Sequence, residues 1–295
     1  MAMPITLKDI TIHPVIEQQG PFFDVMGFFP KLTKELLDEN RSWLQPAFVD
    51  PADKLMLCIQ SFVIKTPHHN ILVDACVGNH KPRPTRPFWH MMNSDRFEKG
   101  LAAVGLTVND IDYVMCTHLH TDHVGWNTKL ENGRWVPTFP KAKYIFHKRE
   151  YAAWEDEARR GGNRPGGSGN VWPFNCEPVV AAGQALLVDD DYQLDDTFWL
   201  TPTPGHSPCH CCVNIRSRGQ QAVVVGDLMH HALQCREPDW STVFDWDPAQ
   251  AAQSRRKFLN DTAGTGRFVL PIHFPHPTTG LIEADGARFH YKFVR

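Results

Sequence analysis

A short stretch of the chain, His118-Leu119-His120-Thr121-Asp122-His123, concentrates three histidines and one aspartate. Imidazole nitrogens and carboxylate oxygens are common ligands of divalent transition metals. Alternate residues of an extended segment point the same way, so His118 and His120 can reach one ion, and a turn after them lets Asp122 and His123 face a second. Chance would produce this arrangement only about 0.003 times in a chain of this length and composition, so the stretch predicts a metal site.

Three further candidate ligands follow predicted strands, each beside a glycine or proline turn. They are His206 in a Thr-Pro-Gly-His run, Asp227 in a Gly-Asp pair, and His273 in a Pro-Ile-His-Phe-Pro run. Ligands at the ends of strands, next to tight turns, suit a preorganised site on a rigid scaffold. These three residues are therefore candidates for the same site.

Taken in order, these motifs resemble the pattern of the metallo-β-lactamase superfamily. They span residues 118–273, and Asp74, at the end of the predicted strand 70–74, matches an acidic residue usually found there. The resemblance covers most of the chain except its N-terminal segment. It implies an α/β fold, a four-layer αββα sandwich of two mixed β-sheets with helices outside and the site at one edge of the sheets.

The resemblance also implies a role for each candidate ligand. One divalent ion would be held by His118, His120 and His206, a second by Asp122, His123 and His273, and Asp227 would bridge the two. A structural zinc site closes with four ligands and favours cysteine, whereas seven nitrogen and oxygen ligands suit two catalytic ions. The expected cofactor is a pair of divalent metal ions, with zinc favoured and manganese, iron or cobalt as alternatives.

Such a pair of ions predicts hydrolysis. A bound metal lowers the pKa of water towards about 7, which supplies hydroxide at neutral pH. We expect a metal-bridging hydroxide to attack the carbonyl of a small lactone or ester, and the positive site to stabilise the oxyanion that forms. Asp122, Asp227 and His230 are the candidate catalytic residues.

His230, three residues beyond Asp227, has two interpretations of equal weight. The continuation Asp245-Trp246-Asp247-Pro248 resembles the branch of the family that contains methyl parathion hydrolase and related lactonases. Those lactonases often carry a tyrosine at this offset to hydrogen-bond the substrate, and a histidine can donate in the same way. The alternative is a histidine that packs in the core.

Other polar residues near the motifs are not expected to bind metal. His276 competes with His273, and the spacing of the run favours His273 as the ligand. His210 is expected to support the ligands or to pack, rather than to bind metal. The thiols of the run at residues 209–212 are expected to be buried and inert, because neighbours on a strand point to opposite faces; these are Cys209, Cys211 and Cys212.

Short apolar runs rich in β-branched and aromatic residues predict strands in both halves of the chain. Helical periodicity predicts helices at 94–104, 148–159 and 248–261. Two groups of strands with helices between them favour two sheets covered by helices, in a single domain spanning residues 1–295. The expected strands are 55–64, 70–74, 111–116, 143–146, 198–201, 211–215, 221–225 and 267–270.

Two segments depart from this pattern. The aromatic-rich segment at about 18–54 is expected to form an N-terminal arm that packs on the core or on a second subunit, which would permit a homodimer. The arm, together with Trp126, Trp135 and Trp172, is also a candidate wall for an apolar pocket. The glycine-rich stretch Arg160–Asn170 is expected to be a surface loop.

Composition excludes several classes of protein. Lys and Arg total 30 and Asp and Glu total 33, giving a net charge of −3, and without a basic run a nucleic-acid partner is not expected. No apolar run approaches the ~20 residues that span a bilayer, so no membrane association is expected. No secretory signal is visible, which favours reduced cysteines and a cytoplasmic location. The expected partner is a small-molecule substrate.

Several hydrolytic reactions share this chemistry. Lactone or ester hydrolysis leads, and a phosphotriesterase is the main alternative because the same hydroxide can attack phosphorus. A β-lactamase is disfavoured because enzymes specialised for that reaction often place cysteine where this chain has Asp227. A glyoxalase-type thioesterase would need a basic cluster for glutathione, and a flavodiiron protein would have glutamate in place of His120.

Overall fold

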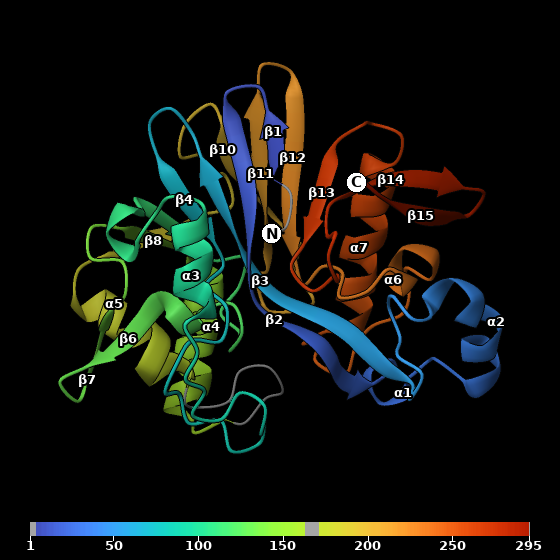
Figure 1. The fold of residues 1–295 in the computed structure, drawn as a ribbon, viewed down its shortest axis with the longest axis horizontal. Helices are drawn as coiled ribbons and strands as arrows, with labels where there is room; N and C mark the ends of the chain where they lie inside the picture. The colour runs from blue at the N-terminus through green and yellow to red at the C-terminus, as the bar shows by residue number, and fades with distance from the viewer. Residues whose placement is uncertain (1–3, 163–170, 295) are drawn as a thin grey trace.

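Two β-sheets pack face to face between outer layers of helices in the computed structural model, which describes residues 4–162 and 171–294 (Figure 1). The first sheet has seven strands in the order β1-β2-β3-β4-β5-β8-β9, and the second has six in the order β10-β11-β12-β13-β14-β15. Both sheets are mixed, because parallel pairs such as β4–β5 and β12–β13 adjoin antiparallel ones. The expected αββα sandwich is therefore confirmed.

The strands of the first sheet are β1 (Ile5–Leu7), β2 (Ile10–Asp24), β3 (Lys54–Lys65), β4 (Asn70–Val73), β5 (Tyr113–Met115), β8 (Lys143–His147) and β9 (Ala185–Val188). Those of the second are β10 (Phe198–Pro202), β11 (Cys211–Ser217), β12 (Gln220–Gly226), β13 (Phe268–Pro271), β14 (Gly280–Asp285) and β15 (Arg288–Phe293). A separate ribbon pairs β6 (Thr128–Glu131) with β7 (Arg134–Pro137). The α-helices are α1 (Val25–Phe28), α2 (Lys34–Leu44), α3 (Arg96–Ala103), α4 (Lys148–Arg159), α5 (Glu177–Ala181), α6 (Leu233–Arg236) and α7 (Pro248–Thr262).

Three apolar layers hold the sandwich together. Successive strand residues point to opposite faces, so Val224 of β12 meets Phe62 of β3 between the sheets, while Val223 turns outward. Val223 shares an apolar cluster with Leu259 of α7, which covers the outer face of the second sheet. On the other side, Phe97 of α3 packs in the cluster that covers the first sheet. The layers fix the two sheets relative to each other, and with them the loops at their shared edge.

Most of the expected elements are confirmed. The helix predicted at 148–159 is α4 (Lys148–Arg159), and the helix predicted at 248–261 is α7, with Asp247 capping its first turn through Ala249 N and Gln250 N. The strand expected at 111–116 is shorter, since only Tyr113–Met115 pair as β5. Several short strands were not expected from the sequence, among them β6, β7, β9, β14 and β15.

The segment at 18–54 combines three kinds of structure. It begins as the end of β2, which pairs with β3 as far as Asp24, and then forms α1 and α2. Leu37 and Leu44 of α2 are fully buried in the cluster on the outer side of the second sheet. The segment therefore packs on this chain's own core, which is one of the two environments expected for the arm.

Part of the expected glycine-rich loop at 160–170 lies outside the described residues, which resume at Val171. Among the helices that the structure describes, none combines the length and the apolar character needed to cross a membrane.

Candidate metal centre

The candidate ligands come from four loops at one edge of the sandwich. The loop after β5 carries His118 to His123, and His206 lies in the connection between β10 and β11. Asp227 directly follows β12, and His273 follows β13 by one intervening residue. Because β12 and β13 are parallel neighbours, their ends place Asp227 and His273 at the same edge of the second sheet.

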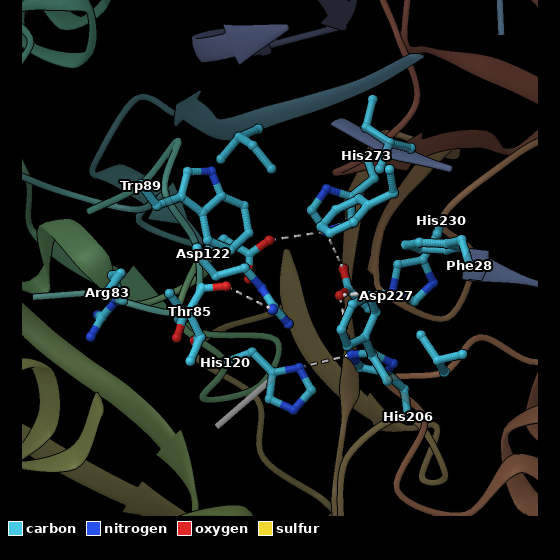
Figure 2. Close-up of a pocket in the computed structure, with 17 residues that line it drawn as sticks. Phe28, Arg83, Thr85, Trp89, His120, Asp122, His206, Asp227, His230 and His273 are labelled. Atoms are coloured by element: carbon cyan, nitrogen blue, oxygen red, sulfur yellow. Dashed lines mark hydrogen bonds and ion pairs between the residues drawn. The ribbon is translucent and has the colours of Figure 1, made fainter. Parts of the chain in front are cut away.

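Asp227 lies at the centre of the group, and its two carboxylate oxygens face different histidines (Figure 2). Oδ2 lies 3.1 Å from Nε2 of His206 and 3.6 Å from Nε2 of His118. Oδ1 lies 3.1 Å from Nε2 of His123 and 3.0 Å from Nε2 of His273. This carboxylate is therefore shared between two sets of imidazoles, as a bridging ligand would be.

The remaining two candidates complete these sets. Nδ1 of His120 lies 2.9 Å from Nε2 of His206, on the Oδ2 side of Asp227. On the Oδ1 side, Oδ2 of Asp122 lies 3.6 Å from Nε2 of His273. The structure thus brings together one four-membered group of ligand atoms and one three-membered group beside Oδ1 of Asp227. The first consists of His118, His120, His206 and Asp227, and the second of Asp122, His123 and His273.

Buried partners behind the first loop orient two of the imidazoles. Asp74 accepts hydrogen bonds from Thr117 N at 2.7 Å and Thr117 Oγ1 at 2.8 Å, and its Oδ2 also lies 2.8 Å from Nδ1 of His123. Since the Thr117 hydroxyl donates to Asp74, its oxygen is left to accept from Nδ1 of His118 at 3.0 Å. We assign both histidines the Nδ1–H tautomer from these partners, which leaves the Nε2 lone pairs facing Asp227.

Buried acceptors also orient the two histidine ligands that follow strands of the second sheet, His206 and His273. Nδ1 of His206 lies 2.8 Å from Oδ1 of Asp245, and Nδ1 of His273 donates to the carbonyl oxygen of Cys58 at 2.9 Å. A carbonyl can only accept, so His273 must carry its proton on Nδ1 and present a bare Nε2. Asp74 thus positions His123, and Asp245 positions His206. The side chains of both aspartates are fully buried.

The donor set fits divalent metal ions. Within the described residues, His118 Nε2, His123 Nε2 and Asp227 Oδ1 are buried without a hydrogen-bond partner. An imidazole nitrogen that faces a carboxylate oxygen at 3.0–3.1 Å needs positive charge between the two atoms. Burial lowers the pKa of His123 and of His273, but Asp227 outweighs it and raises both, so a proton can supply that charge in the protein alone and a metal ion would replace it. Imidazole and carboxylate are the ligand types that suit zinc, manganese, iron and cobalt.

In the protein alone, the histidines around Asp227 divide into neutral and protonated rings, and a metal ion would displace the protons of the latter. Burial and neighbouring histidines hold the pKa of His118 and of His120 well below its usual range, which keeps both neutral and able to bind metal. Burial lowers the pKa of His206, but Asp227 and Asp245 outweigh it and raise the value to about 9. Burial would raise the pKa of Asp227, yet the surrounding histidines hold it well below its usual range, so the carboxylate stays charged.

Glu150 of α4 is a buried residue that the sequence analysis missed. Its Oε2 accepts from Ser207 Oγ at 2.8 Å and Cys209 N at 2.7 Å, and its Oε1 accepts from Leu119 N at 3.2 Å and Trp154 Nε1 at 2.6 Å. It thereby ties the loop of His118 and His120 to the loop of His206. An acidic residue in the first turn of an amphipathic helix gives no sequence signal for this role.

His210 has the supporting role expected of it. Asp227 N donates to Nε2 of His210 at 3.0 Å, so the ring proton is on Nδ1, which lies 2.8 Å from Oγ1 of Thr203. Burial lowers the pKa of His210 to about 3, so the ring stays neutral. His276 is exposed, and its backbone N–H donates to Oε1 of Gln19, so the structure does not bring its side chain into the centre.

A cavity of about 640 Å³ opens onto the candidate ligands. Figure 2 shows Trp89 on the side of Asp122 and Phe28 beside His230, with Asp227 between them. Phe23, Phe28 and Phe244 form much of the apolar wall, so the segment at 18–54 lines the pocket as well as the core.

The three tryptophans expected in the pocket wall lie elsewhere. Trp126 stacks on Phe97 with ring centroids 4.9 Å apart, and Trp172 contacts Tyr151 at 4.5 Å. Trp135 lies under the ammonium group of a buried lysine. Among the described residues, Trp89 is the tryptophan that lines the cavity, and it follows no motif from which the sequence could identify it.

Comparison with known proteins gives a consistent result. Residues 59–265 match the family model of the Metallo-beta-lactamase superfamily. N-acyl homoserine lactonase AttM of Azorhizobium caulinodans is 29% identical over 171 residues, covering 50% of this chain and 56% of that protein. N-acyl homoserine lactonase AiiA of Bacillus thuringiensis subsp. kurstaki is 24% identical over 135 residues, covering 46% and 45%. The chain spans about half the length of these curated relatives.

Solved structures resemble the chain along nearly its whole length. Hydrolase AbOPH of the beta lactamase superfamily has a TM-score of 0.82 at 21% identity, covering 99% of this chain and 97% of that one. AidC, a dizinc quorum-quenching lactonase solved with the product N-hexanoyl-L-homoserine, has a TM-score of 0.79 at 21% identity and the same coverage. At these identities the likeness concerns the fold. Since the family model matches most of the chain and the fold agrees with it, this chain belongs to the metallo-beta-lactamase superfamily.

Proposed function

We propose that this chain is a metal-dependent hydrolase that opens small lactones or cleaves esters. The observation that carries the proposal is the division of the Asp227 carboxylate, with Oδ1 facing His123 and His273 and Oδ2 facing His206 and His118. The seven side chains would hold two divalent ions with Asp227 between them. When bound, the ions would acidify water to supply the nucleophile and would polarise the carbonyl oxygen of the substrate.

The wall of the cavity supports a substrate with an apolar part. The lining residues Phe23, Phe28, Leu57, Ile59 and Trp89 are all apolar and lie in one cavity with the candidate ligands. A lactone that carries an acyl chain combines a reactive carbonyl with such an apolar tail. The curated relatives are N-acyl homoserine lactonases, and their names favour the same substrate class for this chain.

His230 would donate a hydrogen bond to an oxygen of the substrate. Burial lowers the pKa of His230, so the imidazole is neutral and carries one N–H. Its Nε2 lies 3.1 Å from Oδ2 of Asp227, so in the protein alone its N–H faces that carboxylate, and it would be released to a substrate oxygen once a metal ion binds Asp227. A donor fixed at this point would stabilise negative charge that develops on the substrate oxygen during attack.

Arg83 would bind a polar group of the substrate away from the reacting carbonyl. It lines the cavity, is only 3% exposed, and keeps Nε and Nη1 without hydrogen-bond partners among the described residues. Burial lowers the pKa of Arg83 to about 10, so the guanidinium remains charged at neutral pH. Unpartnered buried donors cost free energy unless they gain an acceptor, and the amide carbonyl of an acyl chain would supply one.

The proposal is tested by a substrate panel on protein reconstituted with zinc, manganese or cobalt. The panel contains N-acyl homoserine lactones of several chain lengths, simple lactones, aryl esters and phosphotriesters, with Asp227→Ala as the inactive control. We expect acyl lactones to give the highest kcat/KM. If phosphotriesters react much faster than every lactone and ester, the chain is a phosphotriesterase and the proposed reaction class is wrong. If no substrate is hydrolysed, the result contradicts an enzymatic function.

A further inference from the structure

A second group of metal-binding atoms lies outside the seven candidate ligands. Nε2 of His147, Sγ of Cys209 and Sγ of Cys211 all lie within 4.8 Å of one another, and all three residues are buried. His147 ends β8 and caps α4, while Cys211 is the first residue of β11 in the other sheet and Cys209 lies in the turn just before that strand. The thiols were predicted to be inert because neighbours on a strand point to opposite faces, and nothing in the sequence indicates that His147 lies beside two of them.

One distance within this group, between His147 and Cys209, matches tetrahedral coordination. Bonds of about 2.3 Å from zinc to sulfur and about 2.0–2.1 Å to nitrogen, at the tetrahedral angle, separate the two ligand atoms by about 3.6 Å. In the structure, Nε2 of His147 lies 3.6 Å from Sγ of Cys209. Because Nδ1 of His147 accepts from Arg149 N at 3.2 Å, an ion bound at Nε2 would require the ring proton to move to Nδ1 and this capping bond to be given up. Cys212 follows Cys211 in β11 and points to the opposite face, so it does not join the group.

A fourth ligand is available at the open side of the group. Oδ1 of Asp190 lies 2.8 Å from Nε2 of His147, and its side chain is 59% exposed, so it can move onto an ion without disturbing the core. Oxygen completes a tetrahedral set of two sulfurs, one nitrogen and one oxygen. The exposed side of Asp190 also gives an ion a path from solvent.

We propose that His147, Cys209, Cys211 and Asp190 form a second, thiolate-type metal site that takes a zinc-like divalent ion. The site shares no ligand with the candidate centre at Asp227, so it is independent of the proposed hydrolysis. Soft thiolate ligands select zinc over the harder ions that carboxylates accept.

The surrounding charges favour this site. Two thiolates and one carboxylate carry −3, a divalent ion contributes +2, and Nη2 of Arg149, 2.6 Å from Oδ1 of Asp190, supplies the remaining positive charge. A hydrogen bond with Cys211, together with His147 and Arg149, lowers the pKa of the Cys209 thiol, which favours the thiolate that a metal requires. The same hydrogen bond and burial hold the pKa of the Cys211 thiol well above its usual range, so an ion would have to displace the Cys211 proton on binding. A buried cluster of uncompensated charge would be unfavourable, and here the formal charges cancel.

A disulfide is a poorer use of the two thiols. Cys209 and Cys211 both carry free thiols in the structure. The thiol of Cys211 instead donates to the carbonyl oxygen of Cys209 at 3.4 Å.

An ion in this site would clamp the loop that carries His206. Cys209 lies three residues after His206, and its backbone N–H already donates to Oε2 of Glu150 at 2.7 Å. The ion would add bonds from this loop to His147 at the end of β8, in the other sheet. Its effect would be to stabilise the loop.

Cobalt absorption tests the proposal directly. Purified, reduced full-length chain is titrated with Co²⁺ while the near-ultraviolet sulfur-to-cobalt charge-transfer band is recorded; nitrogen and oxygen ligands do not produce this band. We expect the band to saturate at one equivalent of thiolate-bound cobalt in the wild type. It should disappear in the double variant Cys209→Ser, Cys211→Ser and persist in the matched control Cys212→Ser, a buried neighbour on the opposite face.

No band in the wild type with excess Co²⁺, or a band that survives in the double variant, would overturn the proposal. A chain prepared without reductant that is two hydrogens lighter by intact mass would overturn it in favour of a disulfide. Asp190→Asn keeps the proposal testable if the double variant does not fold, because this side chain is exposed. We expect it to keep the band and to weaken Co²⁺ affinity about tenfold, by analogy with the loss of a ligand's supporting contact; unchanged affinity would contradict the four-ligand site.

Discussion

Nε2 of His230 lies 3.1 Å from Oδ2 of Asp227, the same oxygen that faces His206. This places His230 beside the shared carboxylate and among the residues that line the cavity, although the residue is only 3% exposed, so its catalytic role stays a prediction. Its backbone N–H donates to Oε1 of Gln234 at 2.7 Å, and its ring contacts Phe28, so the imidazole is held in place.

His230→Phe should slow lactone hydrolysis by about 10²-fold. This is the low end for loss of one oxyanion donor, because the metals would also stabilise the negative charge on the oxyanion. The decrease should appear in kcat as well as in kcat/KM, since the hydrogen bond is made in the transition state. Elemental analysis should still find two ions. Loss of an ion would instead make His230 a ligand, and an unchanged rate would make it structural.

Asp227→Ala should remove the bridge between the two ligand groups. We expect dialysed protein to retain at most one ion per chain by elemental analysis, and hydrolysis to fall at least about 10²-fold. Asp239→Ala is the matched control, because Asp239 is an exposed carboxylate that pairs with Arg256 and belongs to neither group of candidate ligands. Two tightly held ions in the Asp227→Ala protein would rule out the bridging role.

A pair of variants can show which of His273 and His276 binds metal. His273→Ala removes an imidazole 3.0 Å from Asp227 and should cost one ion, with a matching loss of activity. His276→Ala changes an exposed side chain and should leave the metal content at two. Metal analysis of both proteins decides the assignment, and the reverse pattern would exchange the two roles.

Asp245→Asn weakens the support behind His206 while keeping the shape of the side chain. Loss of such a carboxylate partner lowers metal affinity about 10–100-fold, and we expect the lower end because an amide oxygen can still accept from Nδ1. Competition with a chromophoric chelator measures the affinity. Unchanged affinity, with an unchanged free energy of unfolding of the metal-free protein, would show that the 2.8 Å contact does not orient the ligand.

Arg83→Met should raise KM for acyl lactones about tenfold, because a hydrogen bond from a charged donor contributes about 1.5 kcal/mol or more. The rate constant kcat should change little, since the contact is made equally in the ground and transition states. Simple lactones without an amide serve as the internal control and should keep their KM. An equal increase in KM for acyl lactones and simple lactones would show that Arg83 supports the shape of the pocket and does not hydrogen-bond the amide.

The sequence predicted the candidate ligands well because they are carried by short local motifs at the ends of strands. Their supports could not be predicted, since Glu150, Asp245 and His147 meet their partners only after folding brings distant segments together. Which imidazole nitrogen faces the centre is likewise a consequence of those partners.

The strand β2 was missed for a different physical reason. It contains Pro14, Gly20 and Pro21, residues that argue against a strand because proline lacks an N–H. After Ile12, β2 pairs only with β3, so its other edge needs no donors, and two register shifts, at Ile16/Gln18 and Pro21/Phe23, absorb the irregular residues. Such a one-sided strand is visible only when its neighbours are known.

The position of the centre between the sheets has a consequence for unfolding. Each proposed ion would take ligands from both sheets: His118 and His120 with His206, and Asp122 and His123 with His273. Two ions would therefore cross-link segments that are far apart in the chain and would bind only when both sheets are assembled. Free metal at a thousand times its dissociation constant adds about 4 kcal/mol to the free energy of unfolding per site, so chelation should lower the melting temperature and could uncouple the melting of the two halves.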